Sequence, residues 1–354
     1  MILPRVARTA LRTVCLCMAA WMINCASTKH TSQGSSAPPR SGPGPGTHTL
    51  PLEIDGTQRT YVIHVPADYT NTRRWPVVVM FHGGGGDAGA AIRSTGWDRK
   101  ADEERFLAVF PQGTASRQNR RRSRGEARFW NDGSNRRSIA AARDNVDDIE
   151  FVARLLADLE NRYSIDSARV YATGFSNGAG MAFRVARELS TDIAAVAPVA
   201  GADWRPEVHP VKPVPLLYMT GDADPLNPIA GGAVRVGRRT MGTKPPVKEM
   251  VNNWLDIHDC ERNPGTVYDR DGDRGLAYRD ENGNDVVVLY TLNGHGHHWP
   301  GSSSRLPDRL VGPNTSSLDA TGEIWRFFTS HTISTEWRPI SALLVEIGDA
   351  VDTP

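Results

Sequence analysis

A serine between two glycines lies where a predicted strand gives way to a predicted helix. The segment reads Gly174-Phe175-Ser176-Asn177-Gly178 and follows a β-branched and aromatic run. This arrangement is typical of a nucleophile elbow, a sharp turn that lifts a serine hydroxyl above a sheet. Glycines are needed there because bulkier neighbours would collide. The pattern is short enough to arise by chance in a chain with 33 glycines, so it needs support from the rest of the chain.

A nucleophilic serine needs a base, an acid that orients the base, and donors for the oxyanion. Two aspartates and three histidines follow predicted strands. They are Asp222 and Asp224, after a strand over 214–220, and His295, His297 and His298, after a strand over 285–292. The chain order of serine, aspartate and histidine is that of α/β-hydrolases. Spacing alone leaves open which aspartate is the acid and which histidine is the base.

Backbone donors for an oxyanion are predicted at two places. A run of four glycines begins at Gly83, after an apolar strand over 76–81 and His82. In α/β-hydrolases the loop at this position supplies one donor, and the N–H groups of Gly83 and Gly84 can approach a substrate closely because no side chain intervenes. The other donor is the N–H of Asn177, directly after the serine.

The elements around these residues predict an α/β fold with a mainly parallel, doubly wound sheet and helices on both faces. The interior strands are apolar throughout, as parallel strands usually are; they are expected over 76–81, 106–111, 193–200, 214–220 and 285–292. Helices are expected over 88–104, 147–159, 247–256 and 315–328, and after each of the strands 193–200 and 214–220. Alternation around Asp55-Gly56 predicts a β-hairpin, and two further strands are expected near 266–269 and 276–279.

The N-terminal residues predict export. Residues 1–25 combine three arginines with a short apolar run, as a secretory signal does, and Cys25 lies where a bacterial lipoprotein signal places its acylated cysteine. We therefore expect an extracellular or periplasmic protein. In one expected form of this protein, a lipid attached to Cys25 anchors it to a membrane. Residues 26–48 predict a flexible Ser/Pro/Gly linker, residues 49–330 the catalytic domain, and residues 331–354 a C-terminal tail.

The charge balance excludes a general polyanion-binding protein. The chain has 41 basic and 40 acidic residues, a net charge of +1, which predicts neither nucleic-acid nor membrane binding. Arginines are concentrated in one polar segment, 113–145, which is long enough for a functional loop. A solvated loop explains this segment, and an anionic polymer is the alternative ligand.

Two segments suggest metal binding without completing a site. The histidines at 295–298 lack further ligands at a suitable spacing, and 269–273, with three aspartates, lacks the twelve-residue pattern of a calcium loop and is better explained as a hairpin turn. We expect no metal and no cofactor. Cys260, the one cysteine outside the predicted signal, is expected to be a small buried side chain rather than a reactive thiol.

These motifs together resemble an esterase family that includes extracellular polyhydroxybutyrate depolymerases, feruloyl esterases and acetylxylan esterases. The resemblance runs from about residue 61 to 328. It is carried by His82-Gly83-Gly84-Gly85, Trp130-Asn131-Asp132, Val146-Asp147-Asp148, the stretch from Arg169 to Met181, Asp224-Pro225, and Gly296-His297-His298-Trp299-Pro300-Gly301. It departs at Ala179, where the family commonly has a second glycine.

The resemblance implies an α/β-hydrolase in which Ser176 is the nucleophile, Asp224 the orienting acid and His297 the base. It implies hydrolysis of carboxylic esters through an acyl-enzyme. The expected substrates are hydroxyalkanoate esters or oligomers of the polyhydroxybutyrate type, and the alternative is feruloyl or acetyl groups on plant polysaccharide. Trp130 and Trp299 are expected to contact substrate, although core packing explains either residue. A non-catalytic surface binding protein is the alternative of another class, and an incomplete triad would be its mark.

Overall fold

The structure is a computed structural model that describes residues 41–115, 127–236, 239–303 and 307–334. The predicted signal segment, Cys25, most of the linker and most of the tail lie outside these residues. So does the middle of the arginine-rich segment. Among the described helices, none combines the length and apolar character needed to cross a membrane.

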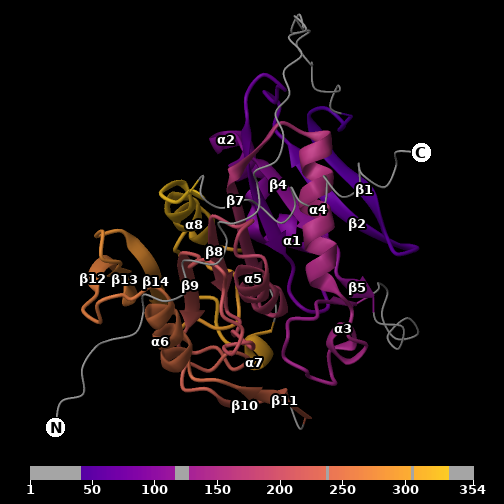
Figure 1. Cartoon of the computed structure of the whole chain (residues 1–354). Helices are drawn as coiled ribbons and strands as arrows, with labels where there is room; N and C mark the ends of the chain where they lie inside the picture. Colours follow the sequence, from indigo (N-terminus) through magenta and orange to yellow (C-terminus); the bar gives the residue numbers. More distant parts are fainter. Residues whose placement is uncertain (1–40, 116–126, 237–238, 304–306, 335–354) are drawn as a thin grey trace, which may run out of the picture. The chain divides into compact units, whose positions relative to one another are not determined.

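A ten-stranded sheet forms the centre of the described chain, in the order β1-β2-β4-β3-β7-β8-β9-β14-β13-β12. The strands are β1 (Gly46–Ile54), β2 (Thr57–Val65), β3 (Trp75–Phe81), β4 (Leu107–Pro111), β7 (Ile165–Phe175), β8 (Ala195–Val199), β9 (Leu216–Gly221), β12 (Gly265–Arg270), β13 (Asp273–Arg279) and β14 (Asp285–Leu292). The six strands from β4 to β14 in this order are parallel, with antiparallel pairs at the two edges (Figure 1). Every residue of β3, β4, β8 and β9 is buried, because helices cover both faces of the sheet.

Two hydrophobic clusters, one on each face of the sheet, hold the helices in place. One cluster contains the apolar sides of α4 (Asp148–Arg162), α5 (Asn177–Glu188) and α6 (Val247–Ile257). The other contains those of α1 (Ala88–Thr95), α2 (Trp97–Glu104) and α8 (Ala320–Thr329). This three-layer arrangement confirms the predicted α/β-hydrolase fold. Short elements complete the description: α3 (Ala140–Arg143), α7 (Asp308–Val311), and the two-stranded sheets β5 (Thr114–Ala115) with β6 (Arg128–Phe129) and β10 (Gly232–Val236) with β11 (Arg239–Lys244).

The sequence misplaced several boundaries, and each error has a local cause. The helix expected over 88–104 is two helices, because Gly96 adopts a left-handed conformation (φ 67°) and ends α1. The helix expected after β8 does not form among the described residues, since 201–215 carries four prolines. The last helix begins at 320 rather than 315 because Asp319 caps it, accepting a hydrogen bond from the N–H of Gly322.

Two further differences concern strands. β1 begins at Gly46, so its first three residues lie inside the predicted linker, because backbone pairing of Gly46 with Val65 at the sheet edge requires no apolar side chain. The hairpin β10-β11 had no prediction, since its glycines and charged residues lack an alternating apolar pattern.

Candidate active site

The carboxyl ends of neighbouring parallel strands bring the predicted site residues to one edge of the sheet. Ser176 directly follows β7, Asp224 lies three residues after β9, and His297 lies five residues after β14. Figure 1 shows β7, β8, β9 and β14 in succession across the sheet, as the pairing requires. Residues 121 positions apart in the chain therefore meet in space.

Ser176 occupies a strained turn between β7 and α5. Its backbone has φ 57° and ψ −114°, a conformation that non-glycine residues rarely adopt. Tight packing maintains the turn: a Cβ at Gly178 would lie 2.1 Å from the carbonyl oxygen of Phe81, and one at Gly174 would lie 2.2 Å from that of Gly178. The two elbow glycines thus let the helix N-terminus sit directly against the end of β3.

The structure joins Ser176, His297 and Asp224 in one hydrogen-bonded chain. The Oγ of Ser176 lies 2.7 Å from Nε2 of His297, and Nδ1 of His297 lies 2.7 Å from Oδ2 of Asp224. His297 and Asp224 are buried, 5% and 3% exposed. This geometry suits proton transfer from the serine hydroxyl to the imidazole, while the carboxylate holds the imidazole tautomer.

The competing aspartate and histidines lie elsewhere. Asp222 is exposed, and its carboxylate accepts a hydrogen bond from the N–H of Gly294. The imidazole of His295 lies within hydrogen-bonding distance of the carbonyl of His298 and the N–H of Ser316. His298 in turn contacts the carbonyl of Gly312. These residues support the loops around the site without reaching Ser176.

Asp224 is held by backbone donors as well as by the imidazole. Its Oδ1 accepts hydrogen bonds from the N–H groups of Leu226 (2.7 Å) and Asn227 (2.8 Å). These charge-assisted bonds occupy one carboxylate oxygen. The other oxygen, Oδ2, is therefore left to face His297.

The glycine turn after β3 lies against the start of α5. A Cβ at Gly84 would lie 3.3 Å from Cβ of Asn177, and one at Gly83 would lie 3.0 Å from the ring of Phe175. Among the turn, loop and cap hydrogen bonds of the described backbone, none has the N–H of Asn177 or Gly84 as its donor. The Phe175 ring also packs on the imidazole of His297, with ring centroids 4.8 Å apart.

The two tryptophans expected to contact substrate are core residues. Trp130 is 0% exposed and donates its indole N–H to the carbonyl of His82. Trp299 is 4% exposed and donates to the hydroxyl of Thr321. Neither side chain is exposed enough to form a wall of an acyl pocket. The expected contact with substrate is therefore replaced by packing in the core for both tryptophans.

Trp130 instead helps to orient Asn177. Its backbone N–H donates to Oδ1 of Asn177 (2.8 Å), and its carbonyl accepts from Nδ2 (3.1 Å). The same Nδ2 donates to Asp132, whose carboxylate also binds Arg136. The described end of the arginine-rich segment thus clamps the residue that follows the serine.

The segments that suggested metal binding, and Cys260, can be located in the described residues. No group of three or more His, Cys, Asp or Glu side chains there is placed to hold a metal ion. The segment with calcium-like spacing is the turn of the β12-β13 hairpin, as predicted, with Asp271 and Gly272 at positive φ. Cys260 is half-buried, and burial raises the pKa of its thiol to about 11.

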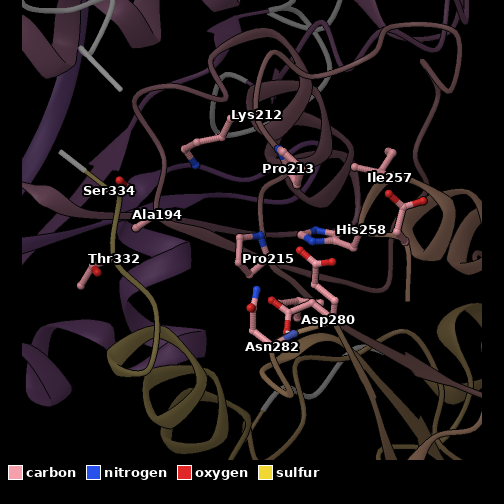
Figure 2. Close-up of a pocket in the computed structure, with 13 residues that line it drawn as sticks. Ala194, Lys212, Pro213, Pro215, Ile257, His258, Asp280, Asn282, Thr332 and Ser334 are labelled. Atoms are coloured by element: carbon pink, nitrogen blue, oxygen red, sulfur yellow. The ribbon is translucent and has the colours of Figure 1, made fainter. Parts of the chain in front are cut away.

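A cavity of about 380 Å³ lies at the other end of the parallel strands, where β8 and β9 begin (Figure 2). Its lining includes Ala194 and Pro215, which immediately precede β8 and β9, and the buried Lys212. Because Ser176 follows the carboxyl end of the neighbouring strand β7 and Asp224 follows that of β9, this cavity is separate from the candidate active site.

Sequence reasoning missed several residues near the triad. Asn227 and Lys244 form a buried hydrogen bond beside Asp224, and Phe175 packs on His297. Phe175 was recognisable as part of the elbow. Neither Asn227 nor Lys244 belongs to a motif, so only their spatial neighbours identify them.

Comparison with known proteins places the chain in a family. Residues 59–241 match the family model described as esterase PHB depolymerase, which is more than half of the chain. Among curated proteins, the chain is 27% identical to NocK of Nocardia uniformis subsp. tsuyamanensis, described as an inferred esterase, over 75% of this chain and 77% of that protein. It is 25% identical to feruloyl esterase B of Piromyces equi, over 68% of this chain and 42% of that protein.

Other relatives agree with this placement. Poly(3-hydroxyalkanoate) depolymerase C of Paucimonas lemoignei is 25% identical over 67% of this chain and 58% of its own length. The crystal structure of a thermostable esterase superposes with a TM-score of 0.51 at 16% identity, covering 81% of this chain and 63% of that chain, which supports the fold. The chain therefore belongs to the PHB depolymerase family of esterases and is a carboxylic ester hydrolase.

Proposed function

We propose that this chain is a serine esterase that works through an acyl-enzyme. The observation that carries the proposal is the continuous hydrogen-bonded chain from Ser176 through His297 to Asp224, at 2.7 Å for each contact. The complete triad also argues against the non-catalytic binding protein. That alternative would predict at least one missing role.

In the proposed mechanism, His297 takes the proton of Ser176 as the hydroxyl attacks the ester carbonyl. Asp224 stabilises the imidazolium that forms. The oxyanion is held by the N–H groups of Asn177 and the Gly83-Gly84 turn. Protonated His297 then gives its proton to the departing alcohol. A water molecule, deprotonated by the same imidazole, hydrolyses the acyl-enzyme and frees the acid.

Ser176→Ala tests the mechanism. We expect kcat/KM for p-nitrophenyl butyrate to fall by about 10⁴-fold or more, because the nucleophile is lost. Ser330→Ala is the matched control, since its hydroxyl binds a carbonyl at the end of α8, away from the triad. Thermal unfolding of both variants should match that of the wild type, and turnover retained by folded Ser176→Ala would refute the assignment.

For the substrate, we infer hydroxyalkanoate esters or oligomers of the polyhydroxybutyrate type. The family description and the named depolymerase relative support this class. The feruloyl esterase relatives keep feruloyl or acetyl esters of plant polysaccharide as the second candidate. A panel of hydroxybutyrate oligomers, methyl ferulate and acetylated xylan, compared by kcat/KM with Ser176→Ala as blank, separates the two. A higher kcat/KM for methyl ferulate or xylan would overturn the first choice.

We also propose that the chain is exported and that a signal over 1–25 is removed, with acylation of Cys25 as the lipoprotein form. The arginines and apolar run of this segment support export. Mass spectrometry of the mature N-terminus provides the test, and a full-length N-terminus beginning at Met1 would contradict it.

A further inference from the structure

Lys244, the last residue of β11, is an unusual side chain for its location. It is only 8% exposed, and no carboxylate in the described ranges forms an ion pair with it. Its Nζ donates to Oδ1 of Asn227 at 2.6 Å. Burying an amine is costly unless the amine is hydrogen-bonded, so this one contact needs an explanation.

Asn227 connects this amine to the catalytic aspartate. Its backbone N–H donates to Oδ1 of Asp224 (2.8 Å), and its Nδ2 donates to the hydroxyls of Tyr218 (2.7 Å) and Thr220 (3.0 Å). Both polar atoms of the Asn227 side chain are therefore hydrogen-bonded, the oxygen to Lys244 and the nitrogen to residues of β9. Among the described residues, Lys244 supplies the donor for Oδ1 of Asn227.

The same network extends to the elbow. The Tyr218 hydroxyl donates to the carbonyl of Gly201 (2.7 Å). Gly201 packs so closely on the elbow that an added Cβ would lie 2.6 Å from the carbonyl oxygen of Ser176. A buried hydrogen-bonded chain thus runs from the aspartate turn to Gly201, which packs on the serine turn. Such networks fix a unique geometry when every member is bonded.

We propose that Lys244 is a positioning residue for the triad: it holds the Asn227 amide, and Asn227 in turn holds Asp224 with Oδ2 directed at His297. The inference rests on the proposed serine mechanism. It assigns a function to the β10-β11 hairpin, which delivers the lysine to the site.

The charges around Lys244 are consistent with a hydrogen-bonding role. Burial lowers the pKa of Lys244 to about 7, Asp224 and Asp132 act to raise it, and Arg136 acts to lower it. The proposed contact is compatible with both the ammonium and the neutral amine. Either form keeps an N–H for Asn227, so the positioning does not require the charge.

Lys244→Met removes the donor while conserving an unbranched stem. We expect kcat for p-nitrophenyl butyrate to fall about 10- to 100-fold, because small misplacements of catalytic groups have such effects. The concentration of active sites in each preparation is measured by titration with a fluorophosphonate, and kcat is calculated per active site. KM should stay within about twofold, since Lys244 does not contact substrate in this proposal. If Lys244→Met does not fold, Lys244→Gln, whose amide stops one bond short, replaces it with the same expected loss.

Lys212→Met is the matched control. Lys212 is likewise buried, 7% exposed, and its Nζ donates to the carbonyl of Ile193 at 2.9 Å. It lines the cavity at the end of the sheet where β8 and β9 begin (Figure 2). We expect its loss to change stability but leave kcat within about twofold of the wild type, which separates positioning from general destabilisation.

A double-mutant cycle tests the route through Asn227. If Lys244 acts through this amide, Lys244→Met should add nothing to the kcat loss of Asn227→Ala. Unchanged kcat in folded Lys244→Met, or effects of the two variants that multiply, would overturn the inference. An active Ser176→Ala protein would instead refute the proposed mechanism itself, so the two failures are distinguishable.

Discussion

At the scale of single residues, His82 shows how the site depends on a neutral imidazole outside the triad. Its Nδ1 lies 2.9 Å from the carbonyl of Gly83, and its Nε2 lies 3.0 Å from the N–H of Gly113. Nδ1 must therefore carry the proton and Nε2 must accept. Burial lowers the pKa of His82 to about 4. Protonation would place two hydrogens between Nε2 and Gly113 and would disturb the glycine turn.

This predicts acid sensitivity that a His82→Asn variant lacks. In the unfolded chain the imidazole titrates near its ordinary pKa. Between about pH 6.5 and about pH 4 the unfolded state therefore binds more protons than the folded state. Stability from His82 is thus present above pH 6.5 and is lost toward pH 4, at up to about 1.4 kcal/mol per pH unit. Urea unfolding at pH 7 and 4.5 should show the wild type losing its advantage over the variant.

The other buried histidines do not obscure this comparison. Burial also lowers the pKa of His258, His295 and His331, but these residues are present in both proteins and cancel in the difference. A stability gap between wild type and His82→Asn that is the same at both pH values would contradict the prediction.

At the scale of elements, the site depends on how closely α5 approaches β3. Gly178 lies in the first turn of α5, and a Cβ there would lie 2.1 Å from the carbonyl oxygen of Phe81 and 2.5 Å from that of His82. Both obstacles are backbone atoms, which cannot rotate away as a side chain can. The helix would therefore have to move away from the strand that carries the glycine turn.

Gly178→Ala should consequently destabilise the protein by about 1–3 kcal/mol or more. This is the opposite of intrinsic helix propensity, which favours alanine by about 1 kcal/mol. Urea unfolding midpoints measure the effect, and kcat should fall as Asn177 shifts from the glycine turn. Gly44→Ala is the control, because nothing lies within 4 Å of its Cβ position. A Gly178→Ala protein as stable as the control would contradict the packing argument.

At the scale of the whole described chain, α8 covers one face of the sheet with aromatic side chains. The Phe328 ring stacks on Tyr171 of β7, with centroids 4.7 Å apart and planes inclined by 6°. It also stacks on Trp97 of α2 at 6.2 Å. The last helix thus joins a central strand to a helix from the first half of the chain, and both neighbours are buried.

Phe328→Ala should lower the free energy of unfolding by about 3–5 kcal/mol, since it removes a fully buried ring and leaves a cavity. Leu310→Ala provides the comparison, because Leu310 is 43% exposed and its truncation should change stability by no more than about 0.5 kcal/mol. Urea titration at pH 7 measures both. Equal effects of the two substitutions would show that α8 does not stabilise the sheet.

Local patterns in the sequence predicted most of the sheet. Strands buried on both faces are apolar throughout, so β3, β4, β8, β9 and β14 were evident. The Asp55-Gly56 turn marked the first hairpin. Irregular segments were less predictable, because the β10-β11 hairpin and the loop after β8 depend on contacts with distant parts of the chain.

The sequence by itself determined the type and order of the groups in the candidate active site: a serine in an elbow, then an aspartate, then a histidine, each after a strand. This was possible because elbows and strand ends are local patterns. Spacing alone left the choice of histidine open and the family resemblance implied His297; the tertiary structure then placed His297, rather than His295 or His298, against Ser176. It also placed Trp130 in the core and Lys244 beside Asn227. The physical reason is that burial and hydrogen bonding are settled by neighbours far away in the chain, which no local pattern specifies.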